Sequence, residues 1–109
     1  MQVERIKFLL EQVKIQPDDP FNYYGLAIEY LNYEPLKALG YFEILLIRFP
    51  DYLPTYYHAA NLYFNLDNFE RAKDTYLKGI ELAKNLKKEK TLKELQGSFA
   101  SFLEESEYE

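Results

Sequence analysis

The chain has 109 residues, enough for one domain with a real core, because chains of this length bury roughly 60–70% of their unfolded surface. Hydrophobic residues make up 48% and charged residues 28%, a composition that excludes a disordered protein. The absence of cysteine excludes disulfides and thiolate metal sites and fits a reducing compartment, and the net charge of −5 argues against general nucleic-acid binding.

The sequence predicts neither a membrane span nor a signal peptide. No apolar run approaches the roughly 20 residues that a bilayer-spanning helix requires. The first 14 residues carry a charge in every turn and contain no small-residue cleavage site. We therefore expect no membrane partner and a cytoplasmic location.

The first half of the chain predicts three helices separated by proline-containing breaks. Apolar side chains recur at helical spacing over residues 2–15. Asp19 is expected to cap a second helix that has Pro20 at its first position and runs to about residue 31. Pro35 opens a third helix, which is expected to end near residue 49.

The second half repeats this order. A helix is expected after Asp51, to about residue 65, and the next over residues 69–84, with Asp67-x-x-Glu70 as its capping box. Residues 85–88 form a basic connection, and the acidic end beyond residue 104 is expected to fray. Apolar residues at helical spacing define the last helix: Leu92, Leu95, Phe99, Phe102 and Leu103.

The pattern predicts an all-α protein. Valine occurs only twice and no stretch alternates with period two, so no strand is expected. The connections are short, which makes sequential helices antiparallel neighbours.

Two segments of the chain repeat with a period of 33–34 residues, which is typical of stacked helix pairs. The repeated motifs are Tyr23-x2-Leu26-Ala27-x2-Tyr30 with Tyr56-x2-Ala59-Ala60-x2-Tyr63, and Ala38-x3-Phe42 with Ala72-x3-Tyr76. Small residues permit close approach of paired helices, and the bulky neighbours fill the space between them. Aromatic residues make up 17% of the chain and concentrate in this repeated region.

These motifs resemble the tetratricopeptide repeat, a helix–turn–helix unit of about 34 residues. The resemblance implies an all-α fold in which antiparallel helix pairs stack as a short right-handed α-solenoid. It divides a single domain of residues 1–109 into two full repeats with a half-repeat helix on each side. The predicted parts are an N-terminal half-repeat helix (1–16), repeat 1 (17–50), repeat 2 (51–84), and a C-terminal capping helix with an acidic tail (85–109).

The tyrosines of the repeats divide into two kinds under this resemblance. Tyr23, Tyr30, Tyr56 and Tyr63 match the family pattern and are expected in the core, although tyrosine stands where the family has tryptophan and alanine where it has glycine. The second tyrosine of each Tyr-Tyr pair lies outside the pattern and is expected to point elsewhere.

In this family the first helices of successive repeats line a concave groove that receives a peptide. Transferring those positions gives the predicted groove residues: Tyr24, Ile28, Leu31, Asn32, Tyr57, His58, Asn61, Phe64, Asn65, Lys90 and Lys93, with Gly97 beside them. The first helices of both full repeats lack lysine and arginine, so the basic clamp that some members use for a carboxylate is absent. The hypothesis is an aromatic-apolar groove with a basic end at Lys90 and Lys93, the alternative for the lysines being a solvated helix start.

No catalytic, cofactor or metal site is predicted. His58 is the only histidine, and it has no cysteine or nearby serine to activate and no cluster of ligand residues around it. No glycine-rich phosphate loop occurs. Gly97 inside the last helix marks either close approach of a partner or helix, or a tolerated defect.

The leading functional prediction is a non-enzymatic scaffold that binds a protein or peptide in its groove. Residues 71–93 hold eight bases and three acids, but without interleaved aromatics a solvated face is favoured over nucleic-acid binding. The alternative is a self-association module, a homodimer formed through apolar surface that the unpartnered first or last helix exposes.

Overall fold

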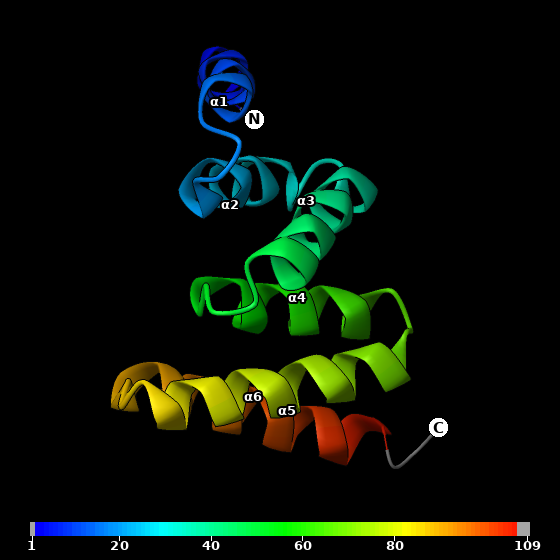
Figure 1. The fold of residues 1–109 in the computed structure, drawn as a ribbon. Coiled ribbons are helices and arrows are strands. Elements are labelled where there is room, and N and C mark those ends of the chain that lie inside the picture. The colour runs from blue at the N-terminus through cyan, green and yellow to red at the C-terminus, as the bar shows by residue number, and fades with distance from the viewer. Residues whose placement is uncertain (1, 107–109) are drawn as a thin grey trace. The chain divides into compact units, whose positions relative to one another are not determined.

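The computed structural model describes residues 2–106, which form six α-helices and no β-strand (Figure 1). The helices are α1 (Val3–Ile15), α2 (Pro20–Tyr30), α3 (Pro35–Arg48), α4 (Pro54–Asn65), α5 (Phe69–Asn85) and α6 (Glu89–Ser106). The all-α prediction is confirmed, and each helix lies where the sequence predicts one. None of the helices in this described part combines the length and the apolarity needed to cross a membrane.

The chain divides into two compact units, and the division falls between Thr55 and Tyr56, just inside α4. Unit 1 contains α1, α2 and α3, and unit 2 contains most of α4 together with α5 and α6.

The predicted start of α2 is confirmed. The Asp19 side chain accepts a hydrogen bond from the backbone N–H of Phe21 at 3.0 Å, and Pro20 occupies the first helical position. A carboxylate at this place satisfies one of the unpaired N–H groups of the first turn, and proline there gives up no helical hydrogen bond. Pro35 opens α3 in the same manner.

Helix α4 begins at Pro54, three residues after Asp51, and ends at Asn65, so the helix predicted after Asp51 is confirmed. The intervening residues form turns, in which the Tyr52 N–H donates to the Phe49 carbonyl at 3.0 Å and the Thr55 N–H donates to the Tyr52 carbonyl at 3.3 Å. Pro54 accounts for these turns, because a residue that precedes proline is disfavoured in the helical conformation.

The predicted capping box at Asp67 is wrong. Asp67 has a φ of 63°, in the left-handed region that closes the end of α4, where the Asn68 N–H donates to the Tyr63 carbonyl at 2.9 Å. The cap of α5 is Asn68, whose side chain accepts from the Arg71 N–H at 3.2 Å. Helix α6 continues to Ser106, past the predicted end, and the acidic residues after it lie outside the described part.

In unit 1, α2 packs against both α1 and α3. A Cβ added to Gly25 would lie 3.1 Å from a Leu9 methyl group, so α1 and α2 approach closely there. The Arg5–Glu29 ion pair, at 2.9 Å, joins the same two helices. Tyr23 and Tyr30 are buried, which confirms their prediction as core residues.

In unit 2, α5 packs against α6 (Figure 1). Helix α4 packs on both, because Tyr56 lies against Gly79 of α5 and Phe64 lies against Phe102 of α6. A Cβ added to Gly79 would lie 2.6 Å from Cβ of Tyr56, a distance that only glycine permits. Tyr56 and Tyr63 are buried as predicted, and Leu95 of α6 is fully buried. Phe99 of α6 is half-buried and packs on Tyr76 with ring centroids 5.6 Å apart.

Candidate peptide-binding surface

Tyr24 is the first predicted groove residue of α2, and it differs sharply from the tyrosine before it. Tyr23 is buried, and its hydroxyl donates to the Pro17 carbonyl at 2.9 Å. Tyr24 is half-buried and lies edge-to-face with Tyr52, with ring centroids 5.7 Å apart. Burial, and secondarily Tyr52, raise the pKa of the Tyr24 hydroxyl, so this group stays protonated at neutral pH.

The other predicted groove residues of unit 1 extend from Tyr24 toward the end of α2. Ile28 and Leu31 are half-buried, and Asn32 is exposed in the turn after the helix. Their spacing from Tyr24, at four, seven and eight positions, places them along one helix face. This face is therefore mainly apolar and partly accessible.

In unit 2, α4 places Tyr57 and His58 side by side at its start. Tyr57 is 37% exposed, and its ring meets the His58 ring edge-on at 5.4 Å. Desolvation lowers the pKa of His58, and the Glu94 carboxylate of α6 opposes that effect. His58 is consequently a neutral aromatic donor or acceptor near neutral pH.

Asn61 takes part in a polar network inside unit 2. Its side-chain oxygen accepts hydrogen bonds from the Tyr76 hydroxyl of α5 and from the Ser98 hydroxyl of α6, the latter at 2.7 Å. The two hydroxyl oxygens lie 3.3 Å apart. Three helices are joined at Asn61, so its side chain is held in a fixed orientation, and this oxygen is already occupied within the unit.

Phe64 lies at the edge of an aromatic cluster that is internal to unit 2. Its ring centroid is 5.2 Å from that of Phe102 and 5.7 Å from that of Phe69. Phe64 is half-buried, so it contributes to packing and still presents part of its ring. Asn65, the last residue of α4, is exposed.

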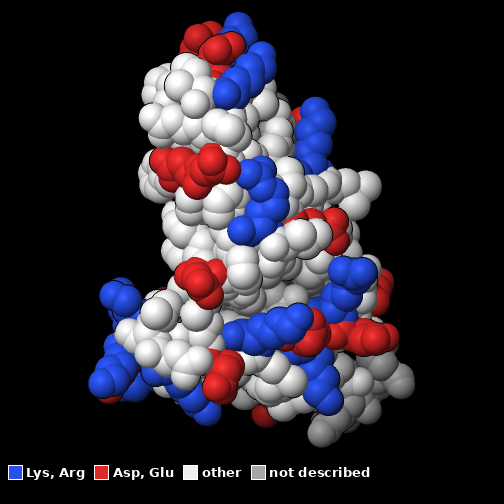
Figure 2. Space-filling model, in the orientation of Figure 1, with Lys and Arg blue, Asp and Glu red and all other residues white. Residues whose placement is uncertain are grey.

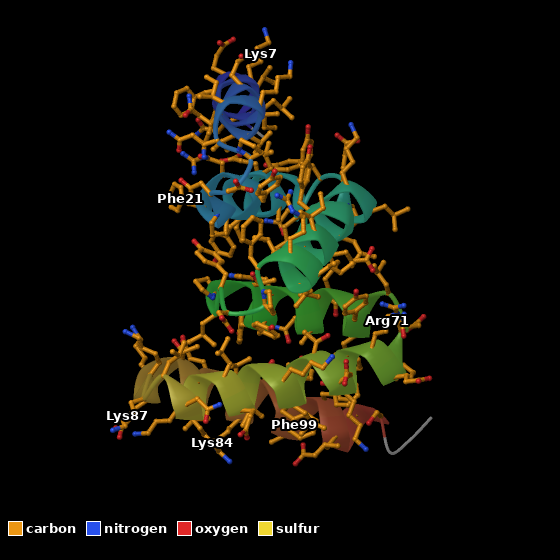
Figure 3. The ribbon with its side chains drawn as sticks, in the orientation of Figure 1. Lys7, Phe21, Arg71, Lys84, Lys87 and Phe99 are labelled. Atoms are coloured by element: carbon orange, nitrogen blue, oxygen red, sulfur yellow. The ribbon has the colours of Figure 1, made fainter. Side chains whose placement is uncertain are left out.

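Lys90 and Lys93 are exposed near the start of α6. Other basic side chains gather where α5 meets α6, at Lys84 and Lys87 (Figures 2 and 3). Glu94 follows Lys93 directly, so the basic end is interrupted by a carboxylate. No described atom lies within 4 Å of a Cβ built on Gly97, so it does not mark close approach of another helix; it is an open, exposed position on α6.

Two contributors to this surface were missed from the sequence: Tyr52, which packs on Tyr24, and Ser98, which bonds Asn61. Tyr52 lies in the connection before α4 and outside the repeated motifs, so the sequence gives no signal for it. The sequence does contain a signal for the contact of Ser98. Asn61 and Tyr76 carry polar groups at the positions where the first repeat has the apolar residues Ile28 and Phe42. Such a paired change predicts a buried polar contact, and a buried contact of this kind needs satisfied partners.

Among residues 2–106, no group of three or more histidine, cysteine or acidic side chains is placed to hold a metal ion. The ring that lies against His58 is that of Tyr57. The chemistry available on the predicted residues is hydrogen bonding, aromatic contact and apolar burial, which are the contacts of a binding surface.

The comparisons with known proteins agree with this architecture. The family model of the tetratricopeptide repeat matches residues 53–86. The crystal structure of a tetratricopeptide repeat domain protein from Salinibacter ruber is 44% identical in sequence, with a TM-score of 0.74. The alignment covers 77% of this chain and 96% of that one. The chain belongs to the tetratricopeptide repeat family.

Further relatives of this tetratricopeptide repeat chain show the same fold. A solution structure of a tetratricopeptide repeat domain protein from Salinibacter ruber is 43% identical, with a TM-score of 0.73, over 80% of this chain and 89% of that one. The Sgt2 TPR domain from Aspergillus fumigatus is 21% identical, with a TM-score of 0.66, over 87% and 66% of the two chains, and supports the fold alone. No curated protein matches the sequence significantly. Tetratricopeptide folds generally mediate protein–protein interaction and are typically non-enzymatic scaffolds, and the all-α helical-repeat fold class of this chain follows from family membership.

Proposed function

We propose that the chain is a scaffold that binds a protein or peptide segment through the first-helix faces of its repeats, the groove surface that the family resemblance predicts. The observation that carries this proposal is the contrast within each Tyr-Tyr pair. Tyr23 and Tyr56 are buried, whereas Tyr24 and Tyr57 are partly accessible at equivalent positions. Tyrosine provides a large rigid contact area with a polar tip, at little cost in conformational entropy.

The chemistry of the surface favours an extended segment with apolar side chains. Unit 1 offers Ile28 and Leu31 beside Tyr24, and unit 2 offers Phe64 beside Tyr57. Asn32 and Asn65 are exposed at the ends of these helix faces and can bond a peptide backbone. The basic end at Lys90 and Lys93 remains part of the proposal, and it predicts weaker partner binding at high salt.

A pull-down with wild type and a Tyr24→Ala/Tyr57→Ala double variant tests the proposal. We expect partners that the wild type retains and the double variant loses. The matched control is Tyr33→Ala, since Tyr33 is an exposed tyrosine in the turn after α2 and outside the predicted surface. If the double variant keeps its helical melting transition and recovers the same partners as wild type, the proposal fails.

One observation favours self-association as a second candidate function. Helix α1 exposes large apolar side chains, with Phe8 60% and Ile15 65% exposed. Apolar side chains gathered on an exposed helix face are typical of an interface. Sedimentation velocity across a concentration range tests this candidate. Self-association predicts a dimer that the Phe8→Glu variant does not form. A wild-type chain that stays monomeric at all concentrations contradicts self-association.

A further inference from the structure

An open cavity of about 360 Å³ lies in unit 1, where α3 ends and the turn leads toward α4. Its size falls in the range of roughly 300–1,000 Å³ that small-ligand sites occupy. The residues that line it are Pro20, Arg48, Phe49, Pro50, Asp51 and Tyr52. All of them belong to unit 1, and none is a predicted groove residue, so the inference below does not depend on the proposed groove function.

The walls of this cavity are aromatic rings and prolines. Tyr52 and Phe49 line it, and the Tyr52 ring makes an edge-to-face contact with Tyr24, with ring centroids 5.7 Å apart. Phe21, labelled in Figure 3, is 57% exposed at the first turn of α2 and adds a further ring to this end of the unit. Rings and prolines carry few rotatable bonds, so such walls keep their shape when a ligand enters.

The only base among the lining residues is Arg48, whose guanidinium already forms hydrogen bonds and an ion pair with neighbouring groups. Its Nη1 donates to the Tyr23 hydroxyl at 3.1 Å and its Nη2 donates to the Pro17 carbonyl at 3.0 Å. Asp18 lies 3.4 Å from the guanidinium, and the group stacks over the Phe49 ring at 5.0 Å. The charge of Arg48 is therefore paired with one carboxylate.

The remaining charge around the cavity is negative. Asp51 lines it, and burial together with the nearby Asp19 carboxylate raises the pKa of the Tyr52 hydroxyl, which puts Asp19 within electrostatic range of that ring. Helix α3 ends at Arg48, which lines the cavity, and the C-terminal end of a helix carries a partial negative charge. The sequence around it is acidic too, since residues 15–70 hold eight acids and two bases.

We propose that this cavity binds a positively charged side chain, lysine or arginine, carried by an extended peptide. The aliphatic part of that side chain packs on Pro20 and Pro50, which line the cavity. Its cationic end meets the face of Tyr52 and the carboxylate of Asp51. Aromatic faces attract cations through their negative quadrupole, and neighbouring carboxylates strengthen the attraction.

The test is a titration of the full ¹⁵N-labelled chain, followed by NMR, with the peptide acetyl-Gly-Arg-Gly-amide. Matched peptides carry norleucine or glutamate in place of arginine. We expect saturable chemical-shift changes confined to residues 17–24 and 48–52, with a dissociation constant on the order of 1 mM or weaker, because the cation–aromatic contact, the ion pair and the aliphatic packing all have to contribute. The norleucine peptide is expected to bind at least about threefold more weakly, and the glutamate peptide not at all.

Two variants and two matched controls assign the effect to the cavity. Asp51→Asn is expected to weaken arginine-peptide binding about threefold, the effect of one exposed ion pair, and Tyr52→Leu about fivefold. The controls are Asp67→Asn, an exposed acid in unit 2, and Tyr33→Leu, an exposed tyrosine in unit 1, and both should keep wild-type affinity.

Three results would overturn the proposal. They are no saturable shift with the arginine peptide, equal affinity for the norleucine peptide, and a loss in the controls as large as in the cavity variants. Asp51 is exposed, so Asp51→Asn decides the question even where Tyr52→Leu perturbs the fold. Retained binding by a folded Asp51→Asn variant at the wild-type constant counts against the proposal.

Discussion

Equivalent core positions of the two units hold apolar side chains in unit 1 and hydrogen-bonded polar side chains in unit 2. In unit 1, Ile28 and Phe42 are apolar, and Phe42 is fully buried. The residues 33 and 34 positions later in unit 2 are Asn61 and Tyr76, which bond each other and Ser98. In unit 2 both positions are polar together, and this pairing avoids the cost of a lone buried polar group.

A second pair of equivalent positions differs in size. Leu45 of unit 1 is fully buried, and Gly79 stands 34 positions later in unit 2, against Cβ of Tyr56. Leucine fills the space in one unit, and in the other the backbone of α5 approaches α4 so closely that no side chain fits. The same repeat frame thus accepts either a bulky side chain or close contact of helix backbones.

The largest expected effect is at Leu45. Leu45→Ala leaves a cavity in a fully buried site and should lower the free energy of unfolding by about 2–5 kcal/mol, measured by urea denaturation. Ile47→Ala on the same helix is the control, because that side chain is 80% exposed, and its effect should stay within about 0.5 kcal/mol. Equal effects for the two variants would contradict the packing described for unit 1.

Gly79→Ala should lower the free energy of unfolding by about 1–3 kcal/mol, because the added methyl group overlaps Cβ of Tyr56 and one helix must shift. Gly40→Ala in α3 is the matched control, since its added Cβ meets no described atom within 4 Å. That change should stabilise the chain by about 0.5–1 kcal/mol through helix propensity. A stabilising Gly79→Ala would show that α4 and α5 lie further apart than described.

The polar network predicts coupling between Asn61 and Tyr76. Asn61→Ile leaves two hydroxyl groups without their acceptor and should cost about 1–3 kcal/mol of unfolding free energy. Tyr76→Phe should cost about 1 kcal/mol by itself. The double variant reproduces the residues of unit 1, and a double-mutant cycle should show a loss at least about 0.5 kcal/mol smaller than the sum. Strictly additive losses would mean that the two residues act independently.

His58 predicts the smallest effect, a shallow pH dependence. Its pKa in the folded chain is lowered from 6.5 by desolvation, so the unfolded chain binds the proton more readily. Neutral His58 therefore contributes to the free energy of unfolding above pH 6.5. This contribution is lost as the pH falls through the pKa of His58 in the folded chain. His58→Gln should remove this component, so the difference in unfolding free energy between wild type and variant changes over that interval. A difference that is flat with pH would contradict the partial burial of the imidazole.

Much of the fold could be predicted from the sequence because helix signals and repeat spacing are local. Asp19 and Pro20 fix the start of α2 through backbone chemistry alone, and the alanines that repeat with the motif are fully buried. The capping box was wrong because two local signals compete in one turn. Asp67 adopts a left-handed conformation at the end of α4, and this moves the cap of α5 to Asn68.

The candidate surface was less predictable, because it depends on contacts between helices. The sequence separates Tyr24 and Tyr57 from the core tyrosines by pattern. It does not reveal that Tyr52 packs on Tyr24, or that Asn61 is engaged by Tyr76 and Ser98. Gly97 could be assigned only once the space around it was known.

The most direct test of the binding surface is site-specific photo-crosslinking in cells. A benzophenone amino acid replaces Tyr24, Tyr57 or Ile47 in turn, the last being the most exposed large apolar residue described and lying on α3, outside the first helices. The proposed function predicts that positions 24 and 57 crosslink the same partner and that position 47 does not. Crosslinks to that partner from position 47 alone, or equally from all three positions, would contradict it.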